Sequence, residues 1–302
     1  MMNEFEKHVG PIELEENHLV IESNTVLSKN AEKCLNVTTK EEKNKVIVKL
    51  VVKKNCVVKN PISLCFGVLK KDTIQNLDIE LVFEKNSSAT LLAHCVFPNG
   101  YNITHNMDAK VLLQENSSCT YKEVHYHGEE GKIIVNPYAR IVLEKNSSYR
   151  NEFKLLKGKA GKVNFDYEVL CKDDTTAELT AIVNAKSNDI INIKEKAVLE
   201  GKNSSSVLIS KIVLNEESQG NVYNEILGIG DYSKGHVDCT EILTSKKAIA
   251  KATPIVDARN NTSNITHEAA IGGVNKDSLN TLMSRGLDKE ESIKIIINGL
   301  LK

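Results

Sequence analysis

Two short segments near the C-terminus contain the residue types that bind soft metal ions. Cys239 lies close to His236 and Asp238, and His267 stands directly before Glu268. Thiolate and imidazole ligands suit zinc, iron and iron–sulfur species. Taken alone, a single cysteine in a strand is more often a small core residue than a ligand. The histidine has an equally plain alternative as a hydrogen-bonded surface residue.

Two other groups of candidate ligands lie earlier in the chain. His125 and His127 flank Tyr126, so on a strand they share one face and could bind a metal, although a pair of exposed histidines on a hairpin is the commoner case. Cys95 follows His94, which places the two on opposite faces of a strand and makes joint ligation unexpected. The chain has no phosphate-binding loop, no GxSxG elbow and no HExxH motif, so we do not expect an enzyme.

The composition argues against several classes of function. The 302 residues include 39 Lys and Arg against 40 Asp and Glu, which gives no electrostatic basis for binding nucleic acid or an anionic membrane. Trp is absent, which argues against an aromatic sugar-binding groove. No apolar run is long enough to span a membrane and the acidic N-terminus is unlike a secretory signal, so we expect a cytoplasmic protein. Its seven cysteines, none in a CxxC pair, are then expected to be reduced.

A repeated segment is the most informative feature of the chain. Short runs of Val, Ile and Leu end in Asn-Ser-Ser corners whose asparagines are Asn86, Asn116, Asn146 and Asn203. The first two steps are 30 residues each, and the third, of 57, has Asp174 near its midpoint. Asn, Asp and Ser favour turns because their side chains bond nearby backbone groups. A period of about 30 residues is typical of stacked repeat architectures.

These patterns predict an all-β fold with a right-handed β-helix (solenoid) as its core and a C-terminal helical hairpin. We expect a short N-terminal cap over 1–35, the β-helix over 36–272 and the hairpin over 273–302. The alternative is an ordinary β-sandwich with coincidental turns. In a solenoid with about 30 residues per turn, Cys239 and His267, which are 28 residues apart, would lie on neighbouring turns about 4.8 Å apart.

The C-terminal hairpin is predicted from helix-capping signals. Asn275 or Asp277 can cap a first helix that ends at Gly286, and Asp288 with Glu291 resembles a capping box for a second helix. The two helices carry more apolar surface than they can bury on each other. We therefore expect the hairpin to dock on the solenoid end, to bind a partner, or both.

The chain resembles the SufB/SufD proteins, core components of the SUF machinery for iron–sulfur cluster assembly, and most of all their compact SufB-like members. The resemblance covers about residues 45–302 and rests on Arg259–Asn261, His267–Ala269, Ser284–Leu287 and Ile297–Leu300. It implies a β-helix with terminal helices, in agreement with the repeat pattern. It also implies a scaffold that holds a transient iron–sulfur cluster.

The resemblance assigns the cluster site to particular residues. Cys239 and His267 match the cysteine and the histidine of the SufB site with the same 28-residue spacing, and Glu268 matches the second glutamate of its Glu-His-Glu triplet. Thr266 replaces the first glutamate. The cysteine that precedes one acid-Asn-Ser corner in SufB has no match here, so the sulfur donor and its route stay open.

The resemblance also implies the partners. The hairpin would bind a SufC-like ABC ATPase, which would hydrolyse the ATP because this chain has no nucleotide motif. Two copies would form a homodimer through the C-terminal rungs of the β-helix, and a sulfur donor and apo-protein recipients would be further partners. Flavin binding is implied only for the wider type of complex. The rival functions are a β-helical carbohydrate-active enzyme and a purely structural repeat protein.

Overall fold

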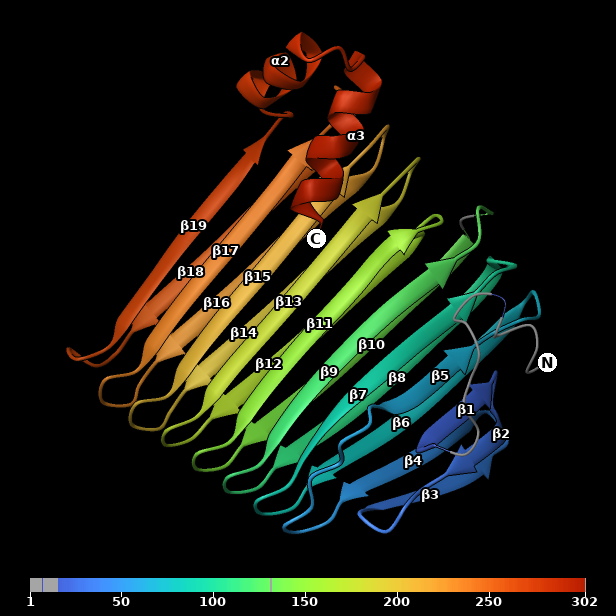
Figure 1. Ribbon diagram of the computed structural model, residues 1–302, viewed down its shortest axis with the longest axis vertical. Helices are drawn as coiled ribbons and strands as arrows, with labels where there is room; N and C mark the ends of the chain where they lie inside the picture. The colour runs from blue at the N-terminus through green and yellow to red at the C-terminus, as the bar shows by residue number, and fades with distance from the viewer. Residues whose placement is uncertain (1–6, 8–15, 131, 302) are drawn as a thin grey trace.

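The computed structural model describes Lys7 and residues 16–130 and 132–301. Two sheets face each other along the length of the molecule, and from residue 45 onward consecutive strands alternate between them (Figure 1). Sheet A contains, in spatial order, β2 (Thr25–Asn30), β1 (His18–Glu22), β5 (Ile62–Gly67), β7 (Ser88–Phe97), β9 (Ser118–His127), β11 (Ser148–Lys157), β13 (Thr176–Ala185), β15 (Ser205–Leu214), β17 (Lys234–Leu243) and β19 (Asn264–Gly272). Sheet B contains β3 (Leu35–Glu42), β4 (Lys45–Val52), β6 (Thr73–Phe83), β8 (Tyr101–Leu113), β10 (Lys132–Leu143), β12 (Lys162–Cys171), β14 (Ile190–Leu199), β16 (Gln219–Gly228) and β18 (Ile249–Ala258).

The predicted solenoid is confirmed. Each turn adds one strand to each sheet, and strands of successive turns pair in parallel, so that Ser148 of β11 lies opposite Ser118 of β9. About eight such turns are stacked. Two helices, α2 (Lys276–Ser284) and α3 (Lys289–Leu300), follow the last strand. Asn275 caps α2, and the capping box between Asp288 and Glu291 is present at the start of α3.

The Asn-Ser corners make the turns between the sheets. Asn86, Asn116 and Asn146 have φ between 57° and 59°, in the left-handed region that asparagine tolerates better than most residues. Their side chains also form a ladder along the solenoid, because Asn116 donates to Asn86 at 3.0 Å and Asn146 donates to Asn116 at 2.8 Å. The corner residues therefore set both the turn and the spacing between turns, as their sequence period predicted.

The two ends of the solenoid differ. At the N-terminal end β1 and β2 form an antiparallel hairpin within the segment expected to be an irregular cap, and β3 pairs antiparallel with β4. At the C-terminal end β18 and β19 have no further strand beside them among the described residues. β19 is exposed along nearly its whole length, whereas alternate residues of β17 are buried. The last turn therefore leaves the interior open at this end.

The helical hairpin packs on the side of sheet A rather than on the solenoid end. Leu301, just after α3, is buried against Ile182 of β13 and Val213 of β15, and Ile297 and Leu300 pack beside it (Figure 1 shows α3 alongside these strands). The hairpin still leaves apolar side chains exposed on its other surfaces. Neither helix of the described chain is long and apolar enough to cross a membrane.

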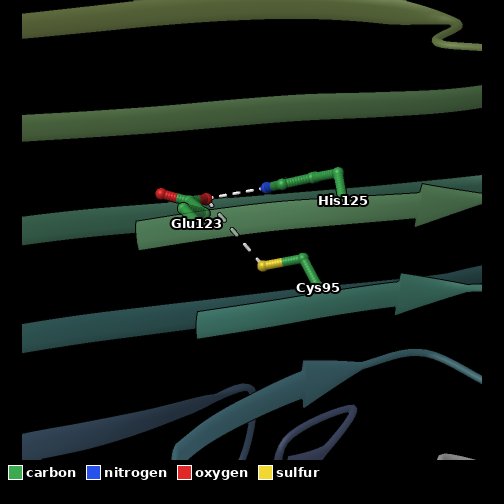
Figure 2. Close-up of side chains that lie close together, drawn as sticks. All are labelled: Cys95, Glu123 and His125. Atoms are coloured by element: carbon green, nitrogen blue, oxygen red, sulfur yellow. Dashed lines mark hydrogen bonds and ion pairs between the residues drawn. The ribbon is translucent and has the colours of Figure 1, made fainter. Parts of the chain in front are cut away.

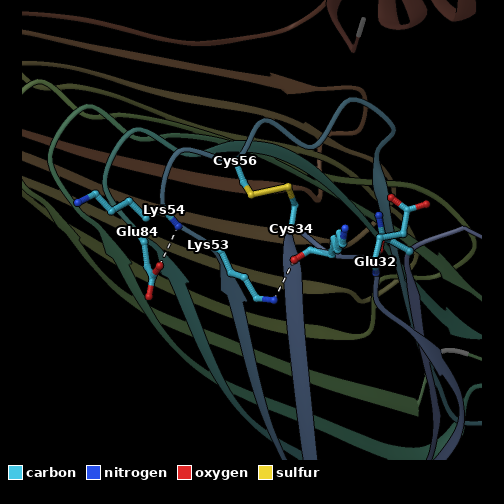
Figure 3. The surroundings of a disulfide bond; sticks show 8 residues. Glu32, Cys34, Lys53, Lys54, Cys56 and Glu84 are labelled. Carbon is cyan, nitrogen blue, oxygen red and sulfur yellow. Dashed lines mark hydrogen bonds between the residues drawn. A yellow bond between two sulfur atoms is a disulfide. The ribbon is translucent and has the colours of Figure 1, made fainter.

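The prediction that all seven cysteines are reduced is wrong for one pair. Cys34 and Cys56 form a disulfide (Figure 3). The antiparallel pairing of β3 with β4 places Cys34 beside the chain that leaves β4, where the Lys53 amide donates to the Cys34 carbonyl at 2.9 Å. This register brings two cysteines 22 residues apart in sequence into bonding range. The other five are free and buried.

Candidate functional site

The structure places Cys239 and His267 on the same face of neighbouring strands. In the parallel pair of β17 and β19, Val237 lies opposite His267 and Cys239 lies opposite Ala269. Side chains alternate along a strand, so all four of these positions face the solenoid interior. The strand spacing puts the Cα atoms of Cys239 and His267 about 8 Å apart. Cys239 is 1% exposed, whereas His267 is exposed because no other strand of the described residues lies beyond β19.

Glu268 lies on the other face of the sheet. It is opposite Asp238, and both alternate with the inward positions. Thr266 shares this outer face, and its Oγ1 forms a hydrogen bond with His236 Nδ1 at 2.8 Å. Within one chain, the fold therefore brings Cys239 and His267 to a common face and does not bring Glu268 there.

Polar side chains surround Cys239 inside the solenoid, although sequence reasoning did not single them out. Glu241, two residues on, shares its inward face and is buried, and neither of its carboxylate oxygens has a hydrogen-bond partner within the described chain. Across the interior, Ser210 Oγ donates to Glu195 Oε2 at 3.1 Å and Asn224 Nδ2 donates to Ser210 Oγ at 2.9 Å. Glu241 could have been found from the sequence, because residues two apart on a strand share one face and Glu241 is two residues after Cys239.

Burial controls the protonation of this group. It raises the pKa of Cys239 to about 12, and the nearby carboxyls of Glu195 and Glu241 add to the rise. Burial likewise raises the pKa of Glu195 to about 8 and that of Glu241 to about 7. The Cys239 thiol therefore keeps its proton at neutral pH. A metal ion that binds it must displace that proton, which makes ligation dependent on pH.

A second polar cluster lies deeper in the solenoid, on β7 and β9. His125 Nε2 is 2.7 Å from Glu123 Oε1, and Cys95 Sγ is 3.9 Å from the same oxygen (Figure 2). The ligand atoms of these three residues lie within 4.8 Å of one another, and all three side chains are buried. Burial lowers the pKa values of His125 and His127 to about 3, so both rings are neutral, and raises that of Glu123 to about 7.

This cluster corrects the expectation that His125 and His127 are exposed. Both occupy inward positions of β9 and are buried. His94 and Cys95 do point to opposite faces, as predicted, but the partner of Cys95 is Glu123, 28 residues later and one turn further along. Sequence reasoning missed the cluster because it compared residues within one strand and not residues separated by one period.

Comparison with known proteins gives a consistent set of matches. Residues 67–300 match the family model described as SUF system FeS cluster assembly, SufBD core domain. An iron–sulfur cluster assembly SufBD family protein of Methanocaldococcus jannaschii is 33% identical over 216 residues, which are 72% of this chain and 68% of that protein. One from Pyrococcus horikoshii is 36% identical over 153 residues, which are 51% of this chain and 47% of the relative. The chain thus covers about two thirds of the first relative and under half of the second.

Proposed function

The chain belongs to the SufBD family of iron–sulfur cluster assembly proteins, and we propose that it is a scaffold on which a nascent cluster forms at the open C-terminal end of the solenoid. One observation carries this proposal. Cys239 and His267 face inward on adjacent strands, at the end where the described residues form no further turn. A thiolate and an imidazole suit iron and iron–sulfur species, and the nascent cluster is the cargo of the site rather than a resident cofactor.

A second copy of the chain would complete this site. One chain supplies Cys239, His267 and the inward carboxylate Glu241, which is a small ligand set for a cluster. The edges of β18 and β19 are unpaired among the described residues, and unpaired edges tend to acquire a partner. Two copies related by a two-fold axis at these edges would double the ligands. Glu268, on the outer face, would take part only where the second copy brings that face to the shared site.

The energy for assembly would come from a separate ATPase, since the sequence lacks a nucleotide-binding motif. We propose that a SufC-like ATPase binds the hairpin of α2 and α3. Met283 of α2 and Ile295 of α3 stay exposed after the hairpin has packed on sheet A, and their exposed fractions of 42% and 47% leave apolar surface for a partner. A sulfur donor, apo-protein recipients and a cytoplasmic location belong to the same proposal.

Anaerobic reconstitution of the complex between scaffold and ATPase, with ferrous iron and sulfide, tests the cluster site. We expect Cys239→Ser to remove the cluster absorbance, because serine nearly preserves the shape of cysteine but is a poor soft ligand. Cys119→Ser is the matched control, since Cys119 is also a free, buried thiol in sheet A. Full cluster yield from Cys239→Ser, or equal loss in both variants, would overturn the assignment.

The partner proposals have separate tests. Ile295→Asp should abolish copurification with the ATPase, because docking would bury an unpaired charge. Val57→Asp places the same charge on an exposed apolar residue far from the hairpin and should leave copurification intact. Light scattering on the complex should give two scaffold chains with two ATPase subunits. A complex with one scaffold chain would refute the shared site.

A further inference from the structure

The buried cluster on β7 and β9 is separate from the open end. Cys95 lies on β7 and Cys239 on β17, five strand spacings apart in sheet A, or about 24 Å. The cluster is enclosed on both sides by further turns. The cluster is therefore too far from Cys239 to belong to the proposed scaffold site, and a function assigned to it is additional to the scaffold function.

The hydrogen bonds fix the tautomers of two histidines. His127 Nδ1 lies 3.1 Å from the Lys159 carbonyl, which only accepts, so this nitrogen carries the proton and His127 Nε2 carries a lone pair. His125 Nδ1 lies 3.3 Å from His127 Nε2. Because His127 Nε2 carries a lone pair, His125 Nδ1 must be the donor. In the neutral ring this leaves a lone pair on His125 Nε2. That lone pair faces an oxygen of Glu123 at 2.7 Å.

The hydrogen bonds of Gln75 fix the tautomer of His105, which lies on the facing sheet. The Gln75 amide nitrogen donates to the carbonyls of Ser23 and Gly67, at 2.7 and 3.2 Å, so its oxygen is the atom that faces His105 Nδ1 at 2.7 Å. His105 Nδ1 is therefore protonated, and Nε2 carries the lone pair. That nitrogen is buried and has no hydrogen-bond partner in the described chain. The His105 ring lies edge-on to that of His125, with centroids 6.3 Å apart.

The Cys95 thiol donates to Glu123 Oε1 at 3.9 Å, but between His125 Nε2 and that carboxylate oxygen the tautomers leave two electron pairs and no donor. A carboxylate oxygen, an imidazole nitrogen and a sulfur atom share one small volume. The His105 ring, which carries an unpaired nitrogen, faces this group with its centroid 6.3 Å from that of His125. Only a proton or a metal ion can occupy the space between them favourably. In a tetrahedral site with bonds of about 2.0–2.3 Å, ligand atoms are about 3.3–3.8 Å apart. The 3.9 Å between Cys95 Sγ and Glu123 Oε1 is close to that value, and the 2.7 Å to His125 requires a small widening.

We propose that Cys95, Glu123 and His125 bind a divalent cation of the zinc or ferrous class inside the solenoid, and that the His105 ring shifts toward them to supply the fourth ligand. One sulfur, two nitrogens and one oxygen suit these ions, whereas Mg²⁺ and Ca²⁺ take oxygen ligands. Tyr167 Oη donates to Glu123 Oε2 at 3.2 Å and so orients the carboxylate. On binding, the cation displaces the thiol proton of Cys95 to solvent. Since the site is sealed, it must be loaded as the turns close during folding.

The metal content of the full-length chain tests this site. The protein is expressed with zinc or with iron, treated with a chelator and assayed by mass spectrometry for metal per chain. All variants carry Cys239→Ser, which removes the other candidate thiol. We expect one retained equivalent in this background and with Cys119→Ser added. Adding Cys95→Ser or Glu123→Gln should lower retention at least tenfold, in variants whose circular dichroism shows a folded solenoid.

Two further readouts use the Cys239→Ser protein and need no substitution at the proposed metal ligands. X-ray absorption of the Cys239→Ser protein should show one sulfur neighbour at about 2.3 Å with nitrogen and oxygen neighbours at about 2.0–2.1 Å. Growth with cobalt should give a thiolate-to-metal charge-transfer band. A folded protein that retains no metal would mean that a proton alone fills the space, and would overturn the proposal. Metal bound without a sulfur neighbour, or equally retained by folded Cys95→Ser, would overturn it as well.

Discussion

Replacing Glu195 with glutamine should change how stability depends on pH. Glu195 is fully buried in β14, where Oε2 accepts from Ser210 and Oε1 has no partner within the described chain. Burial raises its pKa from 4.5 to about 8. The folded chain therefore holds a proton that the unfolded chain releases at lower pH. The stabilisation of the folded chain by this proton is complete below about pH 4.5 and is lost as pH rises through about 8.

The size of the effect follows from this window. Each pH unit between the two pKa values changes the free energy of unfolding by about 1.4 kcal/mol. Between pH 5 and pH 7.5 the wild type should therefore lose about 3 kcal/mol through this one group. Glutamine keeps the shape and an oxygen that accepts from Ser210 but does not ionise, so Glu195→Gln should not show this loss.

Urea unfolding followed by circular dichroism at pH 5 and pH 7.5 measures the difference. Glu241 and Glu123 titrate in the same direction and steepen both curves, so only the difference between wild type and variant reports Glu195. Glu80→Gln is the matched control, because Glu80 lies on the outer face and its surface ion pair contributes under about 1 kcal/mol. Parallel pH dependence in wild type and Glu195→Gln would refute the buried, protonated state of this carboxyl.

Three further changes test other parts of the fold. Asn116→Ala should cost about 2–3 kcal/mol in urea unfolding, about 1–2 from its left-handed backbone and about 1 from two ladder hydrogen bonds. Asn116→Gly should cost about 1 kcal/mol less, because glycine adopts that conformation freely; equal costs would contradict the role of the backbone. Asp189→Ala should cost about 2–4 kcal/mol, since this carboxylate accepts from the amides of Ala160, Gly161 and Lys186 at 2.8–2.9 Å; a loss under about 0.5 kcal/mol would contradict it. Leu301→Asp should release α3 from sheet A, so that hydrogen exchange in α3 accelerates while exchange in β13 and β15 stays slow; a protected α3 would show that other contacts hold it.

The fold was predictable because the corner residues carry their own backbone preference. Asn86, Asn116 and Asn146 need few long-range contacts to form their turns, and their period repeats the same turn at equal intervals. The capping residues Asn275 and Asp288 act in the same local way at the two helices. Where local chemistry and periodicity agree, the sequence alone predicts the architecture.

The burial of polar residues was not predictable to the same degree. In β9 the inward set begins with the apolar Cys119 and Tyr121 and continues with Glu123, His125 and His127. The hydrophobic pattern breaks where the polar residues begin, so the strand looks half exposed when its second half is considered alone. Which residues of the strand face inward becomes clear only when the alternation is followed from Cys119. A polar residue in the core depends on partners from other turns, which periodicity within one strand does not reveal.

The two interior polar groups differ in access, and access limits what each can do. The group around Cys95 is enclosed by turns on both sides, so a ligand there exchanges only if strands separate. Cys239 lies one strand from the end of sheet A, next to the exposed inward face of β19. A scaffold must release what it assembles, so only the open end suits a transient cluster. The sealed group suits an ion that stays bound and stabilises the folded chain, because binding to the folded state alone adds to its stability. In these two proposals the same repeat carries a permanent and an exchangeable site, distinguished by their distance from the last turn.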